Sequence, residues 1–375
     1  MRHPWLPYIG SILWKRRPIQ LTFFVTRKCN ARCPFCFYIA PQGNPAESET
    51  DLSVEEIRNI SSSLGRLLWL AFSGGEIFLR KDLTRISRIF YSLNKPSIML
   101  YPTNGLMPER ITDTIEDILR HCRHTVVVVK LSMDGLHKDH DAIRNTPGSF
   151  EKVMQSYRLL SRLLDRYPNF ELGINTLFCS ENQDKMDDII DFVERLEHVN
   201  THTISMVRGN LVYPHYKRID PWKYHHAIRR LQQNVRDKAS GVYRFRGARL
   251  KAAQDILQRR FIYQTLLRRQ RQIPCYAGRL NLVLTELGNV YPCEILSTSL
   301  GNVREHDYNV RKILRSERSR SVLDSIVHNR CYCTHECYYI TNILFNLRLY
   351  PALAHEYLRI RRPQPGRVAV SPLRP

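Results

Sequence analysis

The sequence predicts an α/β fold: a parallel sheet, curled or closed, followed by a smaller C-terminal α+β domain. Apolar, β-branched or aromatic runs alternate with longer amphipathic stretches through the first 207 residues. Polar or cysteine-bearing loops follow the first four of these runs, and further cysteines gather after residue 272. Because strands that alternate with helices pair in parallel through crossovers, this order predicts six parallel strands with helices between them.

Each predicted element has a local signal. The predicted strands are 20–26, 67–73, 97–103, 125–132, 172–178 and 203–207. The predicted helices lie near 53–64, 82–93, 108–122, 149–166 and 183–198. Ser53 and Glu56 have the spacing of a capping box at the start of the first helix. From about 221 to 272 the pattern is helical and basic, and the apolar runs on both sides of Leu287-Gly288 predict a hairpin.

The loops after the first four predicted strands carry the side chains best suited to chemistry. These loops contain Cys29, Gly74-Gly75-Glu76, Thr103-Asn104-Gly105 and Asp134-Gly135. The carboxyl ends of parallel strands meet at one edge of the sheet, where such folds place their active sites. We therefore expect one site that these loops form together.

The charge of the chain is strongly positive but unevenly distributed. The 375 residues include 57 Lys and Arg against 35 Asp and Glu, a net charge of +22, and 43% are hydrophobic, which excludes a disordered chain. Residues 215–279 hold 17 Lys and Arg against 3 Asp. This segment can be a solvated helical surface, or it can attract an anionic substrate or membrane surface. Nucleic-acid binding is disfavoured, because no RNA-reading motif accompanies the charge.

The sequence predicts a cytoplasmic protein. Its longest apolar run, 125–129, is far shorter than the ~18–20 residues that a membrane span needs. The N-terminus lacks the apolar core of a secretory signal. Five apolar residues precede three basic ones and can form a short interfacial helix, a peripheral membrane contact, although packing under the barrel is the favoured interpretation. They are Trp5, Ile9, Ile12, Leu13 and Trp14.

The first three cysteines predict an iron–sulfur site. Ten cysteines in a chain without a secretory signal indicate metal binding rather than disulfides. Cys29, Cys33 and Cys36 form a CxxxCxxC motif. Three thiolates cannot complete a zinc tetrahedron, but they can hold three irons of a [4Fe–4S] cluster and leave the fourth iron open to a substrate or cofactor.

The remaining cysteines fall into a C-terminal group and two isolated residues. Cys275 and Cys293 lie on either side of Gly288, and Cys331, Cys333 and Cys337 form a CxCxxxC motif. Cys122 and Cys179 stand alone, and we expect them to be buried apolar thiols.

Two motifs together resemble the radical S-adenosylmethionine (radical SAM) enzymes. The cysteine motif has the aromatic Phe35 before its last cysteine, and Ser73-Gly74-Gly75-Glu76 follows it. The hairpin with Cys275, Gly288 and Cys293 resembles the start of the SPASM/twitch extensions of that family, and the resemblance spans about 21–345. It implies a partial (β/α)6 TIM-like barrel, a SAM-binding [4Fe–4S] cluster on the first three cysteines, S-adenosylmethionine, and an auxiliary [4Fe–4S] cluster.

The resemblance also implies which residues contact SAM. Gly74, Gly75 and Glu76 would bind the methionine amino group, Phe35 would present its backbone to the adenine, and Thr103 and Asn104 would lie near the ribose. Further expected contacts to the ribose and carboxylate are Ser132, Asn175 and Arg144. The guanidinium of Arg144 suits the carboxylate, and a position on a helix surface is its alternative. Met206 can pack on the adenine or lie in the core.

The C-terminal cysteines depart from the pattern of a full SPASM domain. That domain has CxxCx5CxxxC after the hairpin, a later single cysteine, and two auxiliary clusters. Five thiols remain in this chain, too few for two clusters. The resemblance therefore implies one auxiliary cluster on Cys275, Cys293, Cys337 and either Cys331 or Cys333, with a four-thiolate zinc site as the alternative.

The resemblance implies an enzyme that cleaves SAM reductively to a 5′-deoxyadenosyl radical and abstracts hydrogen from its substrate. The leading hypothesis is modification of a ribosomally made peptide by a thioether, a carbon–carbon crosslink, epimerisation or oxidation. The alternative, favoured by a single auxiliary cluster, is a dehydrogenase or epimerase that acts on a sugar, an aminocyclitol or a nucleotide-linked molecule. Either reaction needs an electron donor such as flavodoxin or ferredoxin, and a non-catalytic scaffold is disfavoured because Gly74-Gly75-Glu76 is intact.

We expect five segments along the chain. They are an N-terminal extension (1–19), a radical SAM partial barrel (20–214), a basic helical linker (215–272), a SPASM/twitch-like auxiliary domain (273–358) and a basic Pro/Arg tail (359–375).

Overall fold

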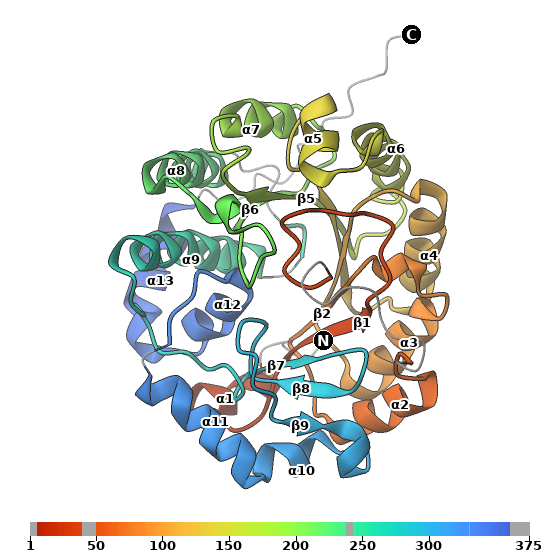
Figure 1. Cartoon of the computed structure of the whole chain (residues 1–375), viewed down its shortest axis with the longest axis vertical. Helices are drawn as coiled ribbons and strands as arrows, with labels where there is room; N and C mark the ends of the chain where they lie inside the picture. Colours follow the sequence, from red (N-terminus) through yellow and green to blue (C-terminus); the bar gives the residue numbers. More distant parts are fainter. Residues whose placement is uncertain (1–5, 40–49, 238–242, 246, 330, 361–375) are drawn as a thin grey trace.

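The computed structural model describes residues 6–39, 50–237, 243–245, 247–329 and 331–360 (Figure 1). Its strands are β1 (Gln20–Thr26), β2 (Trp69–Gly74), β3 (Ile98–Thr103), β4 (Val126–Ser132), β5 (Phe170–Phe178), β6 (Thr201–Met206), β7 (Asn281–Leu284), β8 (Asn289–Tyr291) and β9 (Gly301–Asn302). Its helices are α1 (Gly10–Leu13), α2 (Val54–Ser63), α3 (Leu83–Asn94), α4 (Pro108–His121), α5 (His137–Arg144), α6 (Ser149–Ser161), α7 (Met186–Glu194), α8 (Pro221–Asp237), α9 (Ala248–Arg268), α10 (Val310–Arg315), α11 (Glu317–His328), α12 (Glu336–Leu344) and α13 (Tyr350–Arg359). The 3₁₀ helices are η1 (Leu6–Tyr8), η2 (Ile77–Leu79), η3 (Pro214–Lys217), η4 (Val303–His306) and η5 (Leu347–Leu349). The predicted tail lies outside the described residues from 361 onward.

The predicted α/β class is confirmed. The described strands form one sheet in the order β6-β5-β4-β3-β2-β1-β7-β8-β9, and strands β1 to β6 pair in parallel. The sheet is not closed into a barrel, because its order begins at β6 and ends at β9. The C-terminal hairpin β7–β8 extends the same sheet, since β7 pairs in parallel with β1 (Figure 1).

The predicted strands agree with the structure to within two residues at each end. The predicted helices 53–64 and 82–93 also match α2 and α3 to within one residue. The capping box is present, because the Glu56 N–H donates to Ser53 Oγ and the Ser53 N–H donates to Glu56 Oε2. Helix α5 was not predicted. Six of its eight residues are charged or histidine, so it lacks the apolar period of the other helices.

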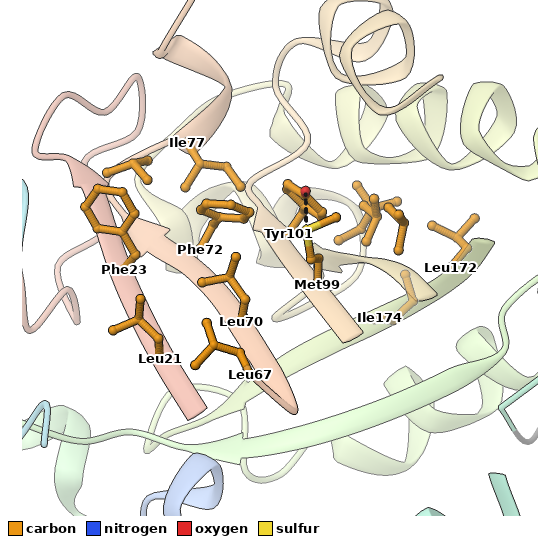
Figure 2. Close-up of a cluster of buried hydrophobic side chains, with 14 of the residues drawn as sticks. Leu21, Phe23, Leu67, Leu70, Phe72, Ile77, Met99, Tyr101, Leu172 and Ile174 are labelled. Atoms are coloured by element: carbon orange, nitrogen blue, oxygen red, sulfur yellow. Dashed lines mark hydrogen bonds between the residues drawn. The ribbon is translucent and has the colours of Figure 1, made fainter. Parts of the chain in front are cut away.

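The main hydrophobic core lies between the sheet and the helices of the barrel. Alternate side chains of neighbouring strands, including Phe23, Phe72 and Tyr101, are fully buried there (Figure 2). The ring of Phe90 on α3 lies 6.1 Å from that of Phe23 and 6.4 Å from that of Phe72. Each such side chain contributes about 1.5–3 kcal/mol by leaving water. This packing fixes the strands whose carboxyl ends carry the site.

The other face of the sheet carries buried polar groups. Lys130 on β4 donates to Thr203 Oγ1 at 3.1 Å, and burial lowers the pKa of its amine to about 7. Helix α9 contacts this face, because Lys251 Nζ lies 5.9 Å from the centre of the Trp69 ring on β2. Helix α9 also packs against α8, α12 and α13, so it joins the barrel to the C-terminal segment.

Several basic side chains of 215–279 form ion pairs within the fold. Arg230 on α8 forms ion pairs with Asp187 and Asp191 on α7. Arg236 and Arg260 both bind Glu356 on α13. These pairs give the basic side chains a structural role in packing α8 and α9.

Among the described residues, no helix has the length and apolar character that crossing a lipid bilayer requires. The N-terminal segment packs under the sheet, because Tyr8 is buried and its hydroxyl donates to the Leu67 carbonyl oxygen at 2.6 Å. Leu13 and Trp14 remain exposed.

Candidate active site

The loop after β1 brings the first three cysteines to one cavity. Cys29, Cys33 and Cys36 line a cavity of about 490 Å³ together with Tyr213 and His215 from the segment after β6. Burial raises the pKa of the Cys33 thiol to about 11 and also raises that of Cys29, and the charge of Arg144 opposes both shifts. A cationic group bound at this cavity would therefore stabilise the thiolates.

Gly74 and Gly75 bring the end of β2 against the backbone of the cysteine loop. The Gly75 N–H donates to the Thr26 carbonyl oxygen at 2.8 Å, and the Glu76 N–H donates to the Lys28 carbonyl oxygen at 2.9 Å. A Cβ atom on Gly75 would lie 2.1 Å from the Lys28 oxygen. Glycine is therefore required here by close backbone approach.

We expect Gly75→Ala to destabilise the fold and displace the cysteine loop. Because the obstacle is backbone rather than a flexible side chain, we expect a loss of about 1–3 kcal/mol in the free energy of unfolding. Urea unfolding of the apoprotein measures it. Gly65→Ala is the matched control, since no atom lies within 4 Å of a Cβ there. Equal stabilities of the two variants would contradict the prediction.

The Glu76 carboxylate belongs to a hydrogen-bond network that joins three loops. It is 1% exposed and accepts hydrogen bonds from Thr103 Oγ1 at 2.8 Å and from the Asn104 N–H at 2.8 Å. Burial raises the pKa of this carboxyl, and the hydrogen bonds partly oppose that shift. Asn104 in turn donates to Asn30 Oδ1 at 2.8 Å, so the loops after β1, β2 and β3 form one network.

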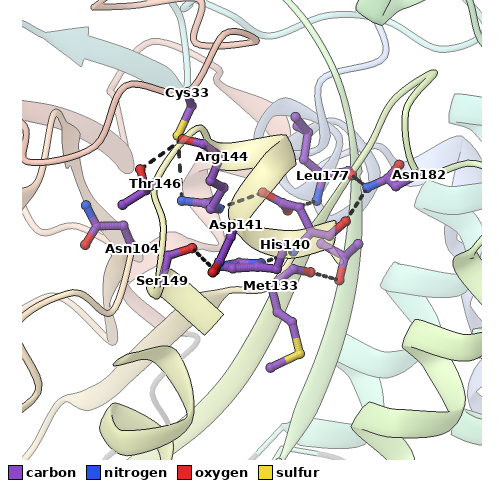
Figure 3. Close-up of polar contacts among 12 residues, drawn as sticks. Cys33, Asn104, Met133, His140, Asp141, Arg144, Thr146, Ser149, Leu177 and Asn182 are labelled. Atoms are coloured by element: carbon purple, nitrogen blue, oxygen red, sulfur yellow. Dashed lines mark hydrogen bonds and ion pairs between the residues drawn. The ribbon is translucent and has the colours of Figure 1, made fainter. Parts of the chain in front are cut away.

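The two strand residues that we expect to contact SAM, Ser132 on β4 and Asn175 on β5, are neighbours in the sheet. Ser132 and Asn175 pair in the sheet, and Ser205 Oγ on β6 donates to Asn175 Oδ1 at 2.8 Å. Arg144, the last residue of α5, reaches the same edge and lies beside Cys33 (Figure 3). Its side chain is buried and forms an ion pair with Asp134 at 2.8 Å, so it is not an arginine on a helix surface.

Phe35 and Met206 lie in different surroundings. Phe35 is buried beside the cavity, with its ring 6.0 Å from that of Tyr216. Met206 belongs to the main hydrophobic core, the second of the two expected alternatives. Its N–H donates to Glu336 Oε1 at 3.3 Å, which links β6 to α12.

Four of the five C-terminal thiols form a second group. Cys275, Cys293, Cys331 and Cys333 line one pocket, together with Tyr338 and Tyr339. Burial raises the pKa of Cys333 to about 12, and the other three thiols add to that rise. The four thiols are therefore close enough to repel one another as anions.

One set of metal-ligand side chains in the C-terminal segment is tightly clustered. In tetrahedral zinc coordination the sulfur atoms lie about 3.8 Å apart. Among the described residues, the metal-ligand atoms that all lie within 4.8 Å of one another belong to Glu294, His335 and Cys337. This set holds a single thiol, that of Cys337.

Cys337 lies outside the second group, which differs from the set expected from the sequence. Its thiol faces Glu294 and His335, and burial followed by the charge of Glu294 raises its pKa. Cys337 is the second residue of α12 and is not among the residues that line the pocket with Cys333. Arg208 and His335 bind Glu294, and although burial opposes ionisation, they lower the pKa of that carboxyl to about 2.

A cavity of about 300 Å³ lies between the two thiol groups. Phe37 and Tyr38 from the first cysteine loop line one side, and Glu286, Tyr291 and Cys293 from the hairpin line the other. The remaining lining residues are Phe24, Gly209, Asn210, Val283, Thr285, Leu287, Asn289, Glu294, Ile295, Leu296 and Ser297. No lysine or arginine lies among them.

Sequence reasoning missed several site residues. Tyr213, His215 and Tyr216 line the first cavity from a segment nearly 180 residues after the cysteine loop, and nothing in their pattern indicates it. Asp134 carried a signal, because it follows the fourth predicted strand at the edge where the site was expected.

Two family models match the chain. The model described as the radical SAM superfamily matches residues 23–193, and a model of an iron-sulfur cluster-binding domain (SPASM) matches residues 275–338. Each match contains one of the two thiol groups. The chain belongs to the radical SAM superfamily.

Similar proteins within this superfamily have different activities. The AdoMet-dependent heme synthase of Methanosarcina barkeri is 25% identical over 78% of this chain and 81% of its own length. The subtilosin biosynthesis protein AlbA of Bacillus subtilis is 23% identical over 78% of this chain and 58% of its own length. Among solved structures, Streptococcus suis SuiB bound to its precursor peptide SuiA has a TM-score of 0.59 at 13% identity, covering 85% of this chain and 70% of SuiB.

The residues present fit the cofactors of a radical SAM enzyme with a SPASM domain, which are [4Fe–4S] clusters and SAM. Three thiols around a 490 Å³ cavity leave one iron open, as SAM binding requires. The four thiols of the second group complete the coordination of another cluster.

Proposed function

We propose that this radical SAM enzyme modifies a peptide at the cavity between its two thiol groups. In this proposal Cys29, Cys33 and Cys36 hold the SAM-binding cluster, and Cys275, Cys293, Cys331 and Cys333 hold one auxiliary cluster. When bound, the first cluster and SAM supply a carbon radical that removes a hydrogen atom from the substrate. The modification is a thioether, a carbon–carbon crosslink, an epimerisation or an oxidation.

The residues around the first cavity bind and orient SAM. Gly74 and Gly75 hold the backbone next to the cysteine loop, so that carbonyl groups can approach the methionine end. Glu76 fixes Thr103 and Asn104 for the ribose, and Arg144 is the partner for the carboxylate. Phe35 and Tyr216 exclude water from the same region.

The lining of the 300 Å³ cavity is the observation that carries the peptide assignment. Half of its lining residues are aromatic or aliphatic, and the two carboxylates in it have partners: Glu286 binds Arg27 and Tyr38, and Glu294 binds Arg208 and His335. A phosphorylated or nucleotide substrate needs cationic groups, and none lines this cavity among the described residues. An uncharged side chain of a peptide suits it.

The names of the relatives support the same assignment. AlbA is a bacteriocin biosynthesis protein, and SuiB was solved with a precursor peptide. Other relatives are named as a heme synthase and as GTP 3′,8-cyclases, so a small-molecule substrate is the second candidate. The reaction also needs an electron donor such as flavodoxin or ferredoxin. We propose that the enzyme acts in the cytoplasm, where thiols remain reduced.

Co-expression with the neighbouring genes, followed by mass spectrometry of peptides and metabolites, tests the proposal. We expect a mass change on a peptide that requires Cys29, Cys33 and Cys36. We also expect Asn210→Arg, which adds a cation to the cavity wall, to reduce this modification, while Asn210→Gln preserves it. A mass change confined to a metabolite, or higher activity of Asn210→Arg, would favour the small-molecule alternative.

A further inference from the structure

Arg144 is a buried cation at the edge of the first thiol group. It is 8% exposed, and its Nη1 lies 4.0 Å from Cys33 Sγ (Figure 3). Its guanidinium also lies 5.9 Å from the centre of the Phe35 ring. Because α5 ends at Arg144 and Asn145 follows in the left-handed conformation, the chain turns away immediately after this side chain.

Asp134 fixes the position of this guanidinium. The carboxylate is fully buried, and its Oδ2 accepts from Arg144 Nε at 2.8 Å while its Oδ1 accepts from the Leu177 N–H at 2.7 Å. Asn182 Nδ2 donates to the carbonyl oxygen of Asp134 at 2.8 Å. The Asp134 N–H donates to His140 Nδ1 at 3.1 Å. Asp134 is therefore held by β5, by the loop after it and by α5, and it can orient Arg144 rigidly.

The two ends of the guanidinium face different groups. Nε is used by Asp134 and Nη1 faces the Cys33 thiol, while Nη2 has no hydrogen-bond partner among the described residues. Nη2 is therefore the nitrogen that suits a ligand carboxylate, and the contact of Nη1 with Cys33 needs a separate explanation.

The reduction potential of an iron–sulfur cluster depends on nearby charge and on hydrogen bonds to its sulfur atoms. Reduction adds negative charge, so a cation beside a ligating sulfur stabilises the reduced state and raises the potential. The carboxylate of Asp134 has the opposite effect, but Arg144 lies between it and Cys33.

We propose that Asp134 is a positioning residue that holds the Arg144 guanidinium against Cys33 Sγ, and that this contact raises the reduction potential of the SAM-binding cluster. The inference rests on the proposed function, because it requires a cluster on Cys29, Cys33 and Cys36. It gives Arg144 a role that does not depend on contact with SAM.

A potentiometric titration monitored by electron paramagnetic resonance tests this role in the full-length, anaerobically reconstituted protein without SAM. The Cys29, Cys33 and Cys36 triple alanine variant identifies the auxiliary signal to be subtracted. We expect Arg144→Gln to shift the potential to a more negative value, and Arg144→Lys, which keeps the charge, to shift it less. Arg120→Gln, a matched control on an exposed part of α4, is expected to leave the potential unchanged.

Asp134→Asn decides whether Asp134 acts by position or by charge. If it positions Arg144, its loss releases the guanidinium and the potential becomes more negative. If it acts only through its own charge, its loss makes the potential more positive, and that result overturns the positioning role. An unchanged potential in Arg144→Gln with full iron content overturns the inference itself. If Asp134→Asn fails to fold, the comparison of Arg144→Gln with Arg144→Lys decides the inference. The absence of the SAM-binding cluster from the wild type would overturn the proposed function instead.

Discussion

Replacement of Cys29, Cys33 and Cys36 together by alanine is expected to abolish cleavage of SAM to 5′-deoxyadenosine. All three thiols line one cavity, and no other thiol among its lining residues can replace them. Without these ligands the iron atom that binds SAM is lost, so we expect no detectable product rather than a slower reaction. Anaerobic incubation with dithionite and SAM, followed by chromatography of the nucleoside products, measures this loss.

Cys122→Ala is the control for that experiment. Cys122 is fully buried in the main hydrophobic core, away from both thiol groups. We expect this variant to keep SAM cleavage and to lose only a small amount of stability. Cleavage that persists in the triple variant would contradict the assignment of these cysteines to the SAM-binding cluster.

The sequence was sufficient to predict the parallel strands and most of the helices between them because their signals are local. Most of these strands are short segments rich in buried apolar side chains, and each predicted helix has its own apolar period. The pairing of β7 with β1 was not predicted, because the contact joins segments about 260 residues apart and depends on a sheet edge that only the folded chain presents. Helix α5 was missed because polar contacts rather than an apolar face hold it.

The candidate site was predicted in its parts but not in its connections. The cysteine and glycine motifs are short and each has a direct chemical requirement, so they are visible in the sequence. The carboxylate of Glu76, however, accepts hydrogen bonds from Thr103 and Asn104, and Asp134 holds Arg144. No spacing rule connects Asp134 to the cysteine loop. Met206 shows the same limit, because whether a strand methionine faces the core or a ligand depends on strand register.

The charge of the chain also has a different meaning in the folded protein. The excess between 215 and 279 can attract an anionic substrate, but Arg230, Arg236 and Arg260 bind carboxylates of α7 and α13. Among the described residues, no lysine or arginine lines the cavity between the thiol groups. Part of the basic charge therefore stabilises the packing of α8 and α9.

Iron analysis of single variants is expected to separate Cys333 from Cys337. Two [4Fe–4S] clusters give about eight iron atoms per chain in the anaerobically reconstituted wild type. Cys333 lies in the pocket with Cys275, Cys293 and Cys331, so Cys333→Ala removes the ligand of one iron atom and is expected to lower the iron content below eight. Cys337 faces Glu294 and His335, so Cys337→Ala is expected to keep about eight.

The two cysteines suit this comparison because they are four residues apart in the sequence but have different neighbours: Cys333 lines the pocket with three other thiols, and Cys337 lies beside Glu294 and His335. An equal loss of iron from Cys337→Ala would show that this thiol is a ligand, as the sequence pattern implied, and would require the residues around Glu294 to rearrange when the cluster binds. About four iron atoms per chain in the wild type would show that the protein holds one cluster, which would contradict the assignment of an auxiliary cluster. About twelve would require ligands beyond these thiols, since the five C-terminal cysteines are too few for two closed clusters.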